Sequence, residues 1–480
     1  MVGAARVGCA GCQRRDRRIA ELECDVQSLR AKLSEVECGQ HRQAHPFRRD
    51  QNDEASAVGA SDESERHDGG ADKKKKPGRR KGHQADLRPT PTPDETDRVI
   101  DVPLKECPMC HVHLYDRGQV TQYQTDLPPI VPIVTRFNIE TGYCPCCRQY
   151  WQGRHPEQTS DAIGAAGNTL GPVVLTMGAE LKHRLGVSYA KMCDFLKTYC
   201  DFKACPAAFI RAEQRLADLA RPTYDLLLDA LRRAQVVHAD ETGWRIGRVN
   251  AWLWVFSSKE TTIYAIRHSR GHDVPEEILG ANFDGYLIVD GGKAYEILTY
   301  TKGQCNAHLL RRTKNLQDIV GEREQKIVTT LHTLIQEAID VAQRRDELTP
   351  EGFARRAAEI DNRLEAWLVD VYTRFEDRSA KLQKLAKHVA NHRDEWLLFL
   401  RDPAVPLTNN HAEHMLRPAV ITRKIGGCNK NLLGALVHSV LSSLMVTCHH
   451  QGKRFLDLAR KLWQSNQPQA IPIEPLSNVS

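Results

Sequence analysis

The stretch Val236–Trp244, V-V-H-A-D-E-T-G-W, begins with two β-branched residues and continues as a buried-type run. This pattern predicts a strand, and it places Asp240 where that strand is expected to end. A second apolar run, Tyr286–Gly292 (Y-L-I-V-D-G-G), leads to Asp290 in the same way. Parallel pairing would bring the carboxyl ends of both strands together. The sequence therefore predicts that Asp240 and Asp290 lie within reach of one metal ion.

A third carboxylate is expected in Leu407–Pro418, L-T-N-N-H-A-E-H-M-L-R-P. Thr408, Asn409 and Asn410 are typical helix-capping residues, and they put Glu413 in the first turns of a helix. Carboxylate oxygens suit Mg²⁺ or Mn²⁺, since water and substrate phosphate can complete the coordination shell. Two such ions about 4 Å apart assist phosphodiester chemistry. The three acids fit that requirement.

Around these acids the pattern predicts an α/β order. Strands are expected at 249–256 and 262–268, a short helix at 274–279, a short strand followed by a basic helix at 304–318, a helical insertion at about 320–400, and a last helix at about 432–448.

Several polar residues of this region have two interpretations. Cys305 and His308 have ligand-like spacing, but such a pair can equally make a local contact at a helix start. Arg417, Arg423 and Lys424 follow the third acid and are candidate phosphate contacts; the alternative is a solvated helix face.

The N-terminal third has a different composition. Apolar residues at heptad spacing predict a short dimerisation coiled coil within residues 1–38, or one amphipathic helix packed on its own protein. Residues 39–97 have few large apolar side chains and predict a disordered basic linker. The linker carries seven cations within nine residues, which either bind a nucleic-acid backbone or form a solvated tail: Lys73, Lys74, Lys75, Lys76, Arg79, Arg80 and Lys81.

Two C-x-x-C pairs predict a structural zinc ribbon at residues 98–160. The expected Zn²⁺ ligands are Cys107, Cys110, Cys144 and Cys147, with Cys146, His111 and His113 as alternatives. Four protein ligands leave no open position for catalysis, so this metal is expected to support the fold and contacts with nucleic acid or protein.

Residues 161–235 have a helical pattern that fits either a helix-turn-helix or a plain helical connector. The chain of 480 residues has a net charge of +6, no apolar run near the roughly 20 residues of a membrane span, and no secretory signal. These features predict a multidomain cytoplasmic protein without membrane contact.

The motifs H-A-D-E-T-G-W, V-D-G-G-K-A-Y, C-N-A-H-L-L-R-R and T-N-N-H-A-E-H-M-L-R-P together resemble those of transposases of the insertion sequence 66 family. The order of coiled coil, K-P-G-R-R-K-G-H linker and cysteine pairs is also similar. One departure is Thr408, where many relatives carry aspartate.

The resemblance implies a ribonuclease-H-like domain of the DDE type at residues 236–430, followed by a C-terminal helix and tail at 431–480. It implies that Asp240, Asp290 and Glu413 hold the catalytic metal ions, and that the N-terminal part recognises the terminal inverted repeats of the element. It further implies a nucleoid-associated homo-oligomer that acts on target DNA together with accessory proteins. The alternatives are a zinc-dependent DNA-binding protein without catalysis and a nuclease without strand transfer.

Overall fold

The computed structural model describes residues 89–106, 108–109, 111–113, 118 and 120–473. The described residues divide into two compact units, a smaller one that ends at residue 131 and a larger one that begins at residue 132. In the first, the described elements are a short 3-10 helix, η2 (Pro93–Glu95), and a bridge between Glu106 and His113. The predicted coiled coil, the basic cluster at 73–81, Cys107 and Cys110 lie outside the described residues.

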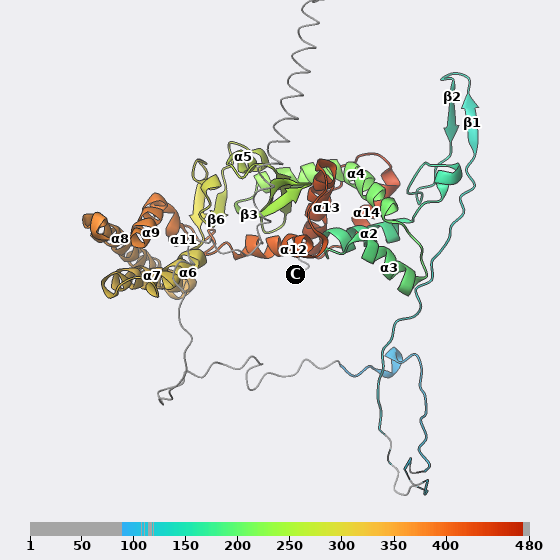
Figure 1. Ribbon diagram of the computed structural model, residues 1–480, viewed down its shortest axis with the longest axis horizontal. Coiled ribbons are helices and arrows are strands. Elements are labelled where there is room, and N and C mark those ends of the chain that lie inside the picture. Colours follow the sequence, from blue (N-terminus) through green and yellow to red (C-terminus); the bar gives the residue numbers. More distant parts are fainter. Residues whose placement is uncertain (1–88, 107, 110, 114–117, 119, 474–480) are drawn as a thin grey trace, which may run out of the picture. The chain divides into compact units, whose positions relative to one another are not determined.

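The described part of the larger unit is built on a mixed sheet, in which Figure 1 labels β3 and β6. Its strand order is β5-β4-β3-β6-β7. Its strands are β3 (Val236–Ile246), β4 (Val249–Ser257), β5 (Thr262–Arg267), β6 (Tyr286–Val289) and β7 (Thr301–Gln304). β3, β4 and β5 pair antiparallel, whereas β3, β6 and β7 pair parallel. Helix α5 (Asp273–Leu279) lies between β5 and β6 in the chain, and η4 (Lys293–Tyr295) lies between β6 and β7. The predicted α/β architecture is confirmed.

Strand β3 is longer than the sequence predicted. It does not end at Asp240 but continues to Ile246, because its antiparallel pairing with β4 extends along this whole segment. Its parallel pairing with β6 covers only Val236 to His238. Asp240 therefore lies inside β3, just beyond the point where the parallel neighbour ends.

One edge of the sheet is closed by side chains of α13 (Leu432–His450). Alternate residues of β5 direct their backbone N–H groups outward, and hydroxyls spaced four apart on α13 accept them. Thr447 Oγ1 accepts from Thr262 at 3.1 Å, Ser443 Oγ from Tyr264 at 2.8 Å, and Ser439 Oγ from Ile266 at 3.3 Å. This helix satisfies donors that an edge strand otherwise leaves open to another chain.

Helix α13 is also long and apolar enough to cross a bilayer by length and composition. Most of it is buried inside the protein, and it binds β5 through its hydroxyls, so it is a core helix. The sequence predicted only a tail beyond this helix. Instead α14 (Phe455–Ser465) follows, because Phe455, Leu458, Leu462 and Trp463 form one buried face at helical spacing.

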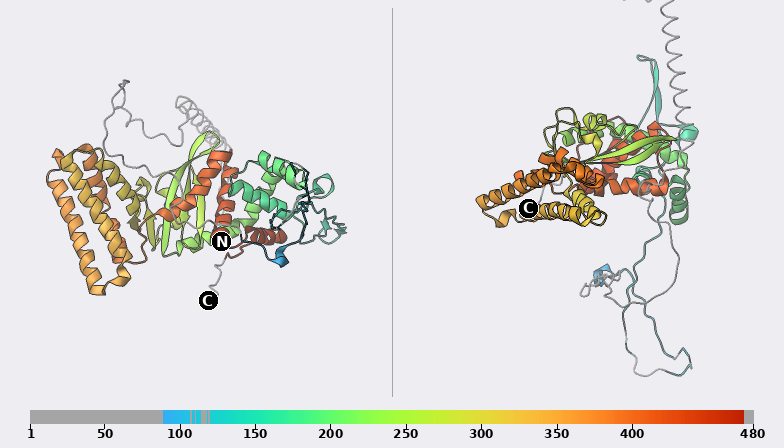
Figure 2. Two further views of the ribbon diagram at one scale, coloured as in Figure 1. Left: turned by 90° about the horizontal axis from the view of Figure 1, so that it is seen from below. Right: turned by 60° about the vertical axis from the view of Figure 1, so that its left-hand side comes forward.

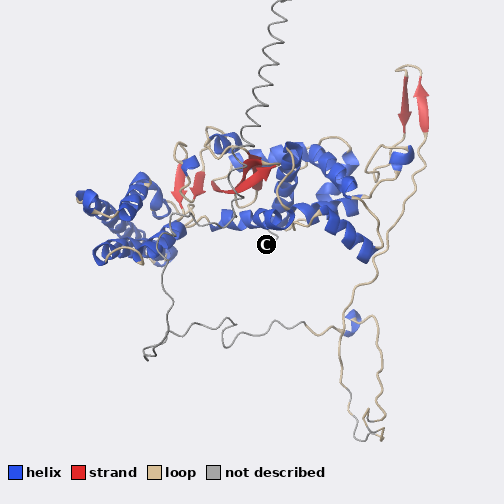
Figure 3. Cartoon of the chain, in the orientation of Figure 1, coloured by secondary structure: helices blue, strands red, loops and turns tan. Residues whose placement is uncertain are grey.

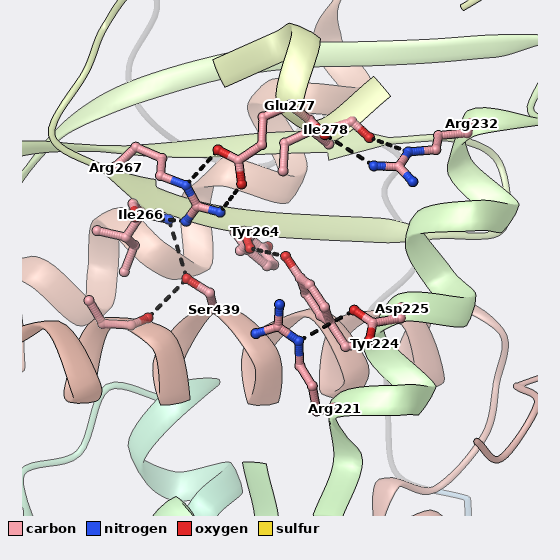
Figure 4. A network of polar contacts seen from close by, with 11 residues as sticks. Arg221, Tyr224, Asp225, Arg232, Tyr264, Ile266, Arg267, Glu277, Ile278 and Ser439 are labelled. Atoms are coloured by element: carbon pink, nitrogen blue, oxygen red, sulfur yellow. Dashed lines mark hydrogen bonds and ion pairs between the residues drawn. The ribbon is translucent and has the colours of Figure 1, made fainter. Parts of the chain in front are cut away.

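Helices α2 (Pro172–His183), α3 (Tyr189–Cys200) and α4 (Pro206–Arg232) share one apolar core with α13, α14 and one face of the sheet. A 3-10 turn, η3 (Gly164–Gly167), precedes them. Figure 4 shows how polar contacts join α4, α5 and β5: Tyr224 donates to the Tyr264 carbonyl at 3.2 Å, Arg232 to the Ile278 carbonyl at 2.9 Å, and Arg267 to Glu277 at 2.9 Å. These helices are therefore part of the body that carries the sheet.

The chain from β7 to α12 is helical, as predicted for the insertion (Figure 3). Its elements are α6 (Asn306–Gln317), α7 (Glu322–Gln343), η5 (Arg345–Glu347), α8 (Pro350–Thr373), η6 (Phe375–Asp377), α9 (Ala380–Asn391), α10 (Arg393–Trp396) and α11 (Leu398–Arg401). The long helices run side by side (Figure 2) and share an apolar core that also includes Ile288 of β6. Helix α12 (Asn410–Gly426) then returns to the sheet, where Ala412 and Leu416 pack on Trp244.

Candidate active site

The register of β3 and β6 places Asp240 opposite Asp290. Val236 pairs with Tyr286 and His238 with Ile288, so paired residues are 50 positions apart. The two aspartates are separated by the same number.

Both aspartates are directed to the same face of the sheet. Side chains alternate along a strand, and Leu287 packs on the core containing α4 whereas Ile288 packs on the insertion. Asp290 continues the alternation on the side of Ile288. Asp240 shares its face of β3 with Trp244, which packs on α12. The two carboxylates therefore face the side of the sheet that α12 and the insertion cover.

Glu413 is brought to this face by Asn409, which fixes the start of α12 against β3. The Asn409 Nδ2 donates to the carbonyl of Ala239 at 2.8 Å, and its Oδ1 lies 3.0 Å from His238 Nδ1. Its backbone N–H donates to Cys305 Sγ at 3.1 Å. Glu413 lies one turn further along α12 and is thereby brought beside Asp240, the residue that follows Ala239 in β3.

The predicted capping role of Asn409 is wrong. It occupies the N-cap position of α12, but its side chain makes no capping hydrogen bond. Its amide donor and acceptor are already engaged by β3, so this side chain holds a tertiary contact and not the helix end.

Burial and the neighbouring acids both shift the pKa of Asp240. Burial, then the charges of Asp290 and Glu241 and to a smaller extent of Glu413, together raise the pKa of Asp240 to about 7, although the hydrogen bond from the Glu241 backbone N–H lowers it. A cation bound among these carboxylates would remove the repulsion and favour their ionised forms.

The donor atoms fit a hard divalent cation. Asp290 Oδ1 and Glu413 Oε1 are buried and have no hydrogen-bond partner in the described structure. Buried oxygens without partners are costly unless a cation or water binds them. As they stand, no three His, Cys, Asp or Glu side chains among the described residues converge closely enough to form a metal site. The carboxylates therefore supply suitable oxygens, although these do not converge on a single point in the described structure.

Cys305 and His308 adjoin the acids through a local contact. The Cys305 thiol hydrogen-bonds His308 and raises its pKa, and the charges of Asp290 and Glu413 act in the same direction. His308 Nε2 lies 3.6 Å from Glu413 Oε1. Of the two interpretations of this pair, the structure contains the contact at a helix start.

Two polar residues near the acids, Glu241 and Asn409, make contacts that the sequence did not predict. Glu241 is nearly buried and accepts from Arg270 Nε at 3.0 Å and from the Tyr295 hydroxyl at 3.1 Å. Its position directly after Asp240 was visible, but strand alternation sends it to the opposite face. The role of Asn409 had no signal in sequence, because its partners lie about 170 residues away.

The three predicted phosphate-binding cations of α12 differ in environment. Arg417 and Lys424 are exposed. Arg423 turns back to β3, where its guanidinium donates to Thr242 Oγ1 at 3.1 Å and to the carbonyl of Gly243. Arg423 therefore already has protein partners, and these tie the end of α12 to the strand that carries Asp240.

The second cysteine pair lies at the tip of a β-hairpin. Strands β1 (Thr141–Cys144) and β2 (Gln149–Gln152) pair antiparallel, with Cys144 opposite Gln149. The backbone of Cys147 hydrogen-bonds the Cys144 thiol and lowers its pKa, while Trp151 Nε1 donates to Cys147 Sγ at 3.3 Å.

A mixed sheet with buried carboxylates beside the ends of two parallel strands defines an α/β protein with an acidic centre. The chain matches the model of the Transposase IS66 family over residues 167–436, more than half of its length. It therefore belongs to this family of transposases, which confirms the resemblance seen in the sequence.

Two relatives come from Sinorhizobium fredii (strain NBRC 101917 / NGR234). The chain is 24% identical to "Uncharacterized protein y4jD" over 386 residues, covering 73% of this chain and 72% of the relative. It is 33% identical to "Uncharacterized protein y4jO" over 90 residues, covering 19% of this chain and 27% of that relative. Neither name states an activity.

Proposed function

We propose that this transposase cleaves DNA at the ends of its insertion element and transfers the freed strands to target DNA. Asp240, Asp290 and Glu413 are the proposed metal ligands. The observation that carries the proposal is that three acids distant in sequence face the same side of the sheet, two of them with buried oxygens that accept no hydrogen bond in the described structure. The strand order β5-β4-β3-β6-β7, with three antiparallel and then two parallel strands, supports a ribonuclease-H-like domain of the DDE type.

Two Mg²⁺ or Mn²⁺ ions would activate the attacking oxygen and stabilise the leaving oxygen of an in-line displacement. Asp240 and Asp290 would hold the ions from adjacent strands, and Glu413 would complete the second site from α12. In the first step water attacks a phosphodiester and releases a 3′ hydroxyl. In the second step that hydroxyl attacks a target phosphodiester and displaces another 3′ oxygen, which takes up a proton.

The remaining parts of the chain would bind DNA and partners. We assign structural Zn²⁺ to Cys107, Cys110, Cys144 and Cys147 on the basis of their spacing. The cations of residues 73–81, together with Arg417 and Lys424, would contact phosphates, whereas Arg423 is engaged by β3. End pairing requires a homo-oligomer, for which the coiled coil of residues 1–38 is the candidate, and accessory proteins of the same element would assist. The protein would work in the cytoplasm on nucleoid DNA.

The test is Mg²⁺-dependent cleavage and joining of labelled element-end DNA. Asp240→Asn, Asp290→Asn and Glu413→Gln are each expected to reduce both steps at least 100-fold while end binding is retained. Asp284→Asn, an exposed acid before β6, is the matched control and should behave like the native chain.

Three outcomes are distinguishable. Loss of both reactions in the three variants alone supports the proposal. Cutting without joining by the native chain would make the protein a nuclease. Binding without cutting by every protein, even with accessory proteins supplied, would make it a DNA-binding derivative.

A further inference from the structure

The turn that follows Asp290 rests directly on the helical insertion. Gly291 has φ +85°, a conformation that other residues rarely adopt. A Cβ atom at this position would lie 2.8 Å from Cε1 of His388 on α9 and 3.2 Å from Oε1 of Gln304 at the end of β7. The turn thus needs glycine for its conformation and for this close approach.

Gln304 is in turn held by a buried carboxylate of the insertion. Its Nε2 donates to Glu395 Oε2 at 2.6 Å. The same carboxylate oxygen lies 2.9 Å from His392 Nδ1, and Oε1 lies 3.4 Å from Lys302 Nζ on β7. Burial raises the pKa of Glu395, but the hydrogen bonds from His392 and Gln304 and the charge of Lys302 outweigh it and lower that pKa. Glu395 is therefore ionised, and its carboxylate links two side chains of β7 to the insertion.

The His388 ring packs against aromatic side chains of the insertion. Its ring meets Trp396 edge-on at a centroid distance of 5.3 Å and His392 at 5.1 Å. Trp396 is 1% exposed and belongs to the core of the insertion helices. The His388 ring cannot move away from Gly291 without disturbing that core, because close-packed interiors have little free volume.

We propose that the insertion positions Asp290, with Glu395 and His388 as positioning residues. Glu395 holds Gln304, His388 closes the other side, and the Asp290 turn is seated between them. The proposal rests on the proposed function of Asp290 as a metal ligand. It assigns the insertion a role in assembling the acidic centre, in addition to any contact with DNA.

The test compares Glu395→Gln with the native chain in two measurements that need no catalysis. Glu395→Gln keeps the shape of the side chain but removes the charge that Lys302 and His392 face. We expect Mn²⁺ affinity, measured by electron paramagnetic resonance of free Mn²⁺, to fall about tenfold. We also expect backbone hydrogen exchange to rise in residues 288–293 but not in β5 or α13. Glu337→Gln is the control, since its carboxylate pairs with Arg363 on the surface of the insertion.

Activity provides the third measurement. The cleavage rate of Glu395→Gln at saturating DNA should fall about tenfold and recover with excess Mn²⁺, while the Kd for element ends stays unchanged. Exchange and Mn²⁺ affinity equal to those of the native chain would overturn the proposal. A uniform rise of exchange throughout the protein would also overturn it, because that result indicates a merely structural residue.

Failure of the proposed function has a different signature. If Asp290→Asn leaves Mn²⁺ affinity unchanged, the assignment of the metal site is wrong. Gly291→Ala provides a second variant that acts on the turn from the other side. Gly291→Ala should reproduce the loss of Mn²⁺ affinity. Circular dichroism should show that its helices remain folded.

Discussion

At the scale of single residues, Asn409 has the most consequential contacts near the acids. Its amide bonds both a carbonyl and a histidine of β3, and its backbone N–H bonds Cys305. It is 1% exposed, so no water replaces these partners in the folded protein. Removing one side of a buried hydrogen bond leaves its partner unsatisfied, which costs more than the bond itself contributes.

We expect Asn409→Ala to lower cleavage at least tenfold and to reduce the free energy of unfolding by about 1–3 kcal/mol. The neighbouring Asn410→Ala is the control, since Asn410 is exposed. Cleavage assays and urea unfolding check both values. Equal behaviour of the two variants would contradict the role of Asn409 in fixing α12.

A buried histidine cluster predicts acid sensitivity. His438 Nδ1 lies 3.1 Å from His183 Nδ1, and His183 Nε2 lies 3.0 Å from Glu213. Trp244 contacts the His438 ring, and burial, helped by the charges of His183 and Lys182, holds the pKa of His438 well below its usual value. The unfolded chain binds this proton near pH 6.5, whereas the folded chain does not. Stability is therefore lost as the pH falls below that value.

His438→Asn removes this titrating group. Between pH 6 and pH 5, the free energy of unfolding of the native chain should fall more steeply than that of the variant, by up to about 1.4 kcal/mol per pH unit. Urea unfolding followed by tryptophan fluorescence measures both slopes. Parallel slopes would show that His438 does not titrate differently in the two states.

At the scale of elements, α13 closes one edge of the sheet by binding backbone N–H groups of β5, whereas the insertion contacts side chains of β7 at the other end of the strand order. Helix α13 supplies a row of hydroxyls to β5, and the insertion supplies Glu395 to β7. A covered edge cannot pair with a second chain. The two sets of contacts act on different parts of the sheet. The hydroxyls of α13 bind the edge strand β5, whereas Glu395 holds Gln304, which lies against the turn that carries Asp290.

Two adjacent serines of α13 allow a matched test of the hydrogen bonds between α13 and β5. Ser443 Oγ accepts from the Tyr264 N–H at 2.8 Å, whereas Ser442 Oγ is buried without a hydrogen-bond partner in the described structure. Ser443→Ala should cost about 1–3 kcal/mol of stability, because a buried N–H loses its acceptor. Ser442→Ala should be neutral or stabilising. Thermal unfolding of both variants decides, and the reverse order would refute the edge contact.

At the scale of the whole molecule, the larger unit combines the sheet, the helices before it and the helices after it in shared cores. The acidic centre depends on segments from three parts of this unit: β3, the turn after β6 and the start of α12. Cys144 and Cys147, at the tip of the β1–β2 hairpin, belong to the same unit.

We expect the chain to bind one Zn²⁺ per molecule and Cys107→Ala to lose it with weaker end binding. Cys146→Ser should retain the metal, because Cys146 lies outside both C-x-x-C pairs. Metal analysis measures the zinc content, and circular dichroism checks that the helices persist. Unchanged zinc in Cys107→Ala would reject the ligand assignment.

The sequence alone determined the kinds of elements, the α/β order and the positions of the three candidate acids. It could do so because apolar periodicity and strand-end carboxylates are local patterns. It misplaced the end of β3, because the polar segment after Asp240 looks like a turn although its pairing with β4 continues to Ile246. The second C-terminal helix, α14, was missed for a similar reason: a short amphipathic segment forms a helix only when its face is buried.

Only the tertiary structure decided which polar residues support the acids. Asn409 has the sequence signature of a helix cap, yet β3 takes both groups of its amide. Gly291 resembles any turn glycine, yet His388, almost a hundred residues later, lies against it. The physical reason is the same in both cases. Hydrogen bonds and van der Waals contacts act over a few ångströms in space, whereas local sequence patterns carry no information about which distant segment comes within that range.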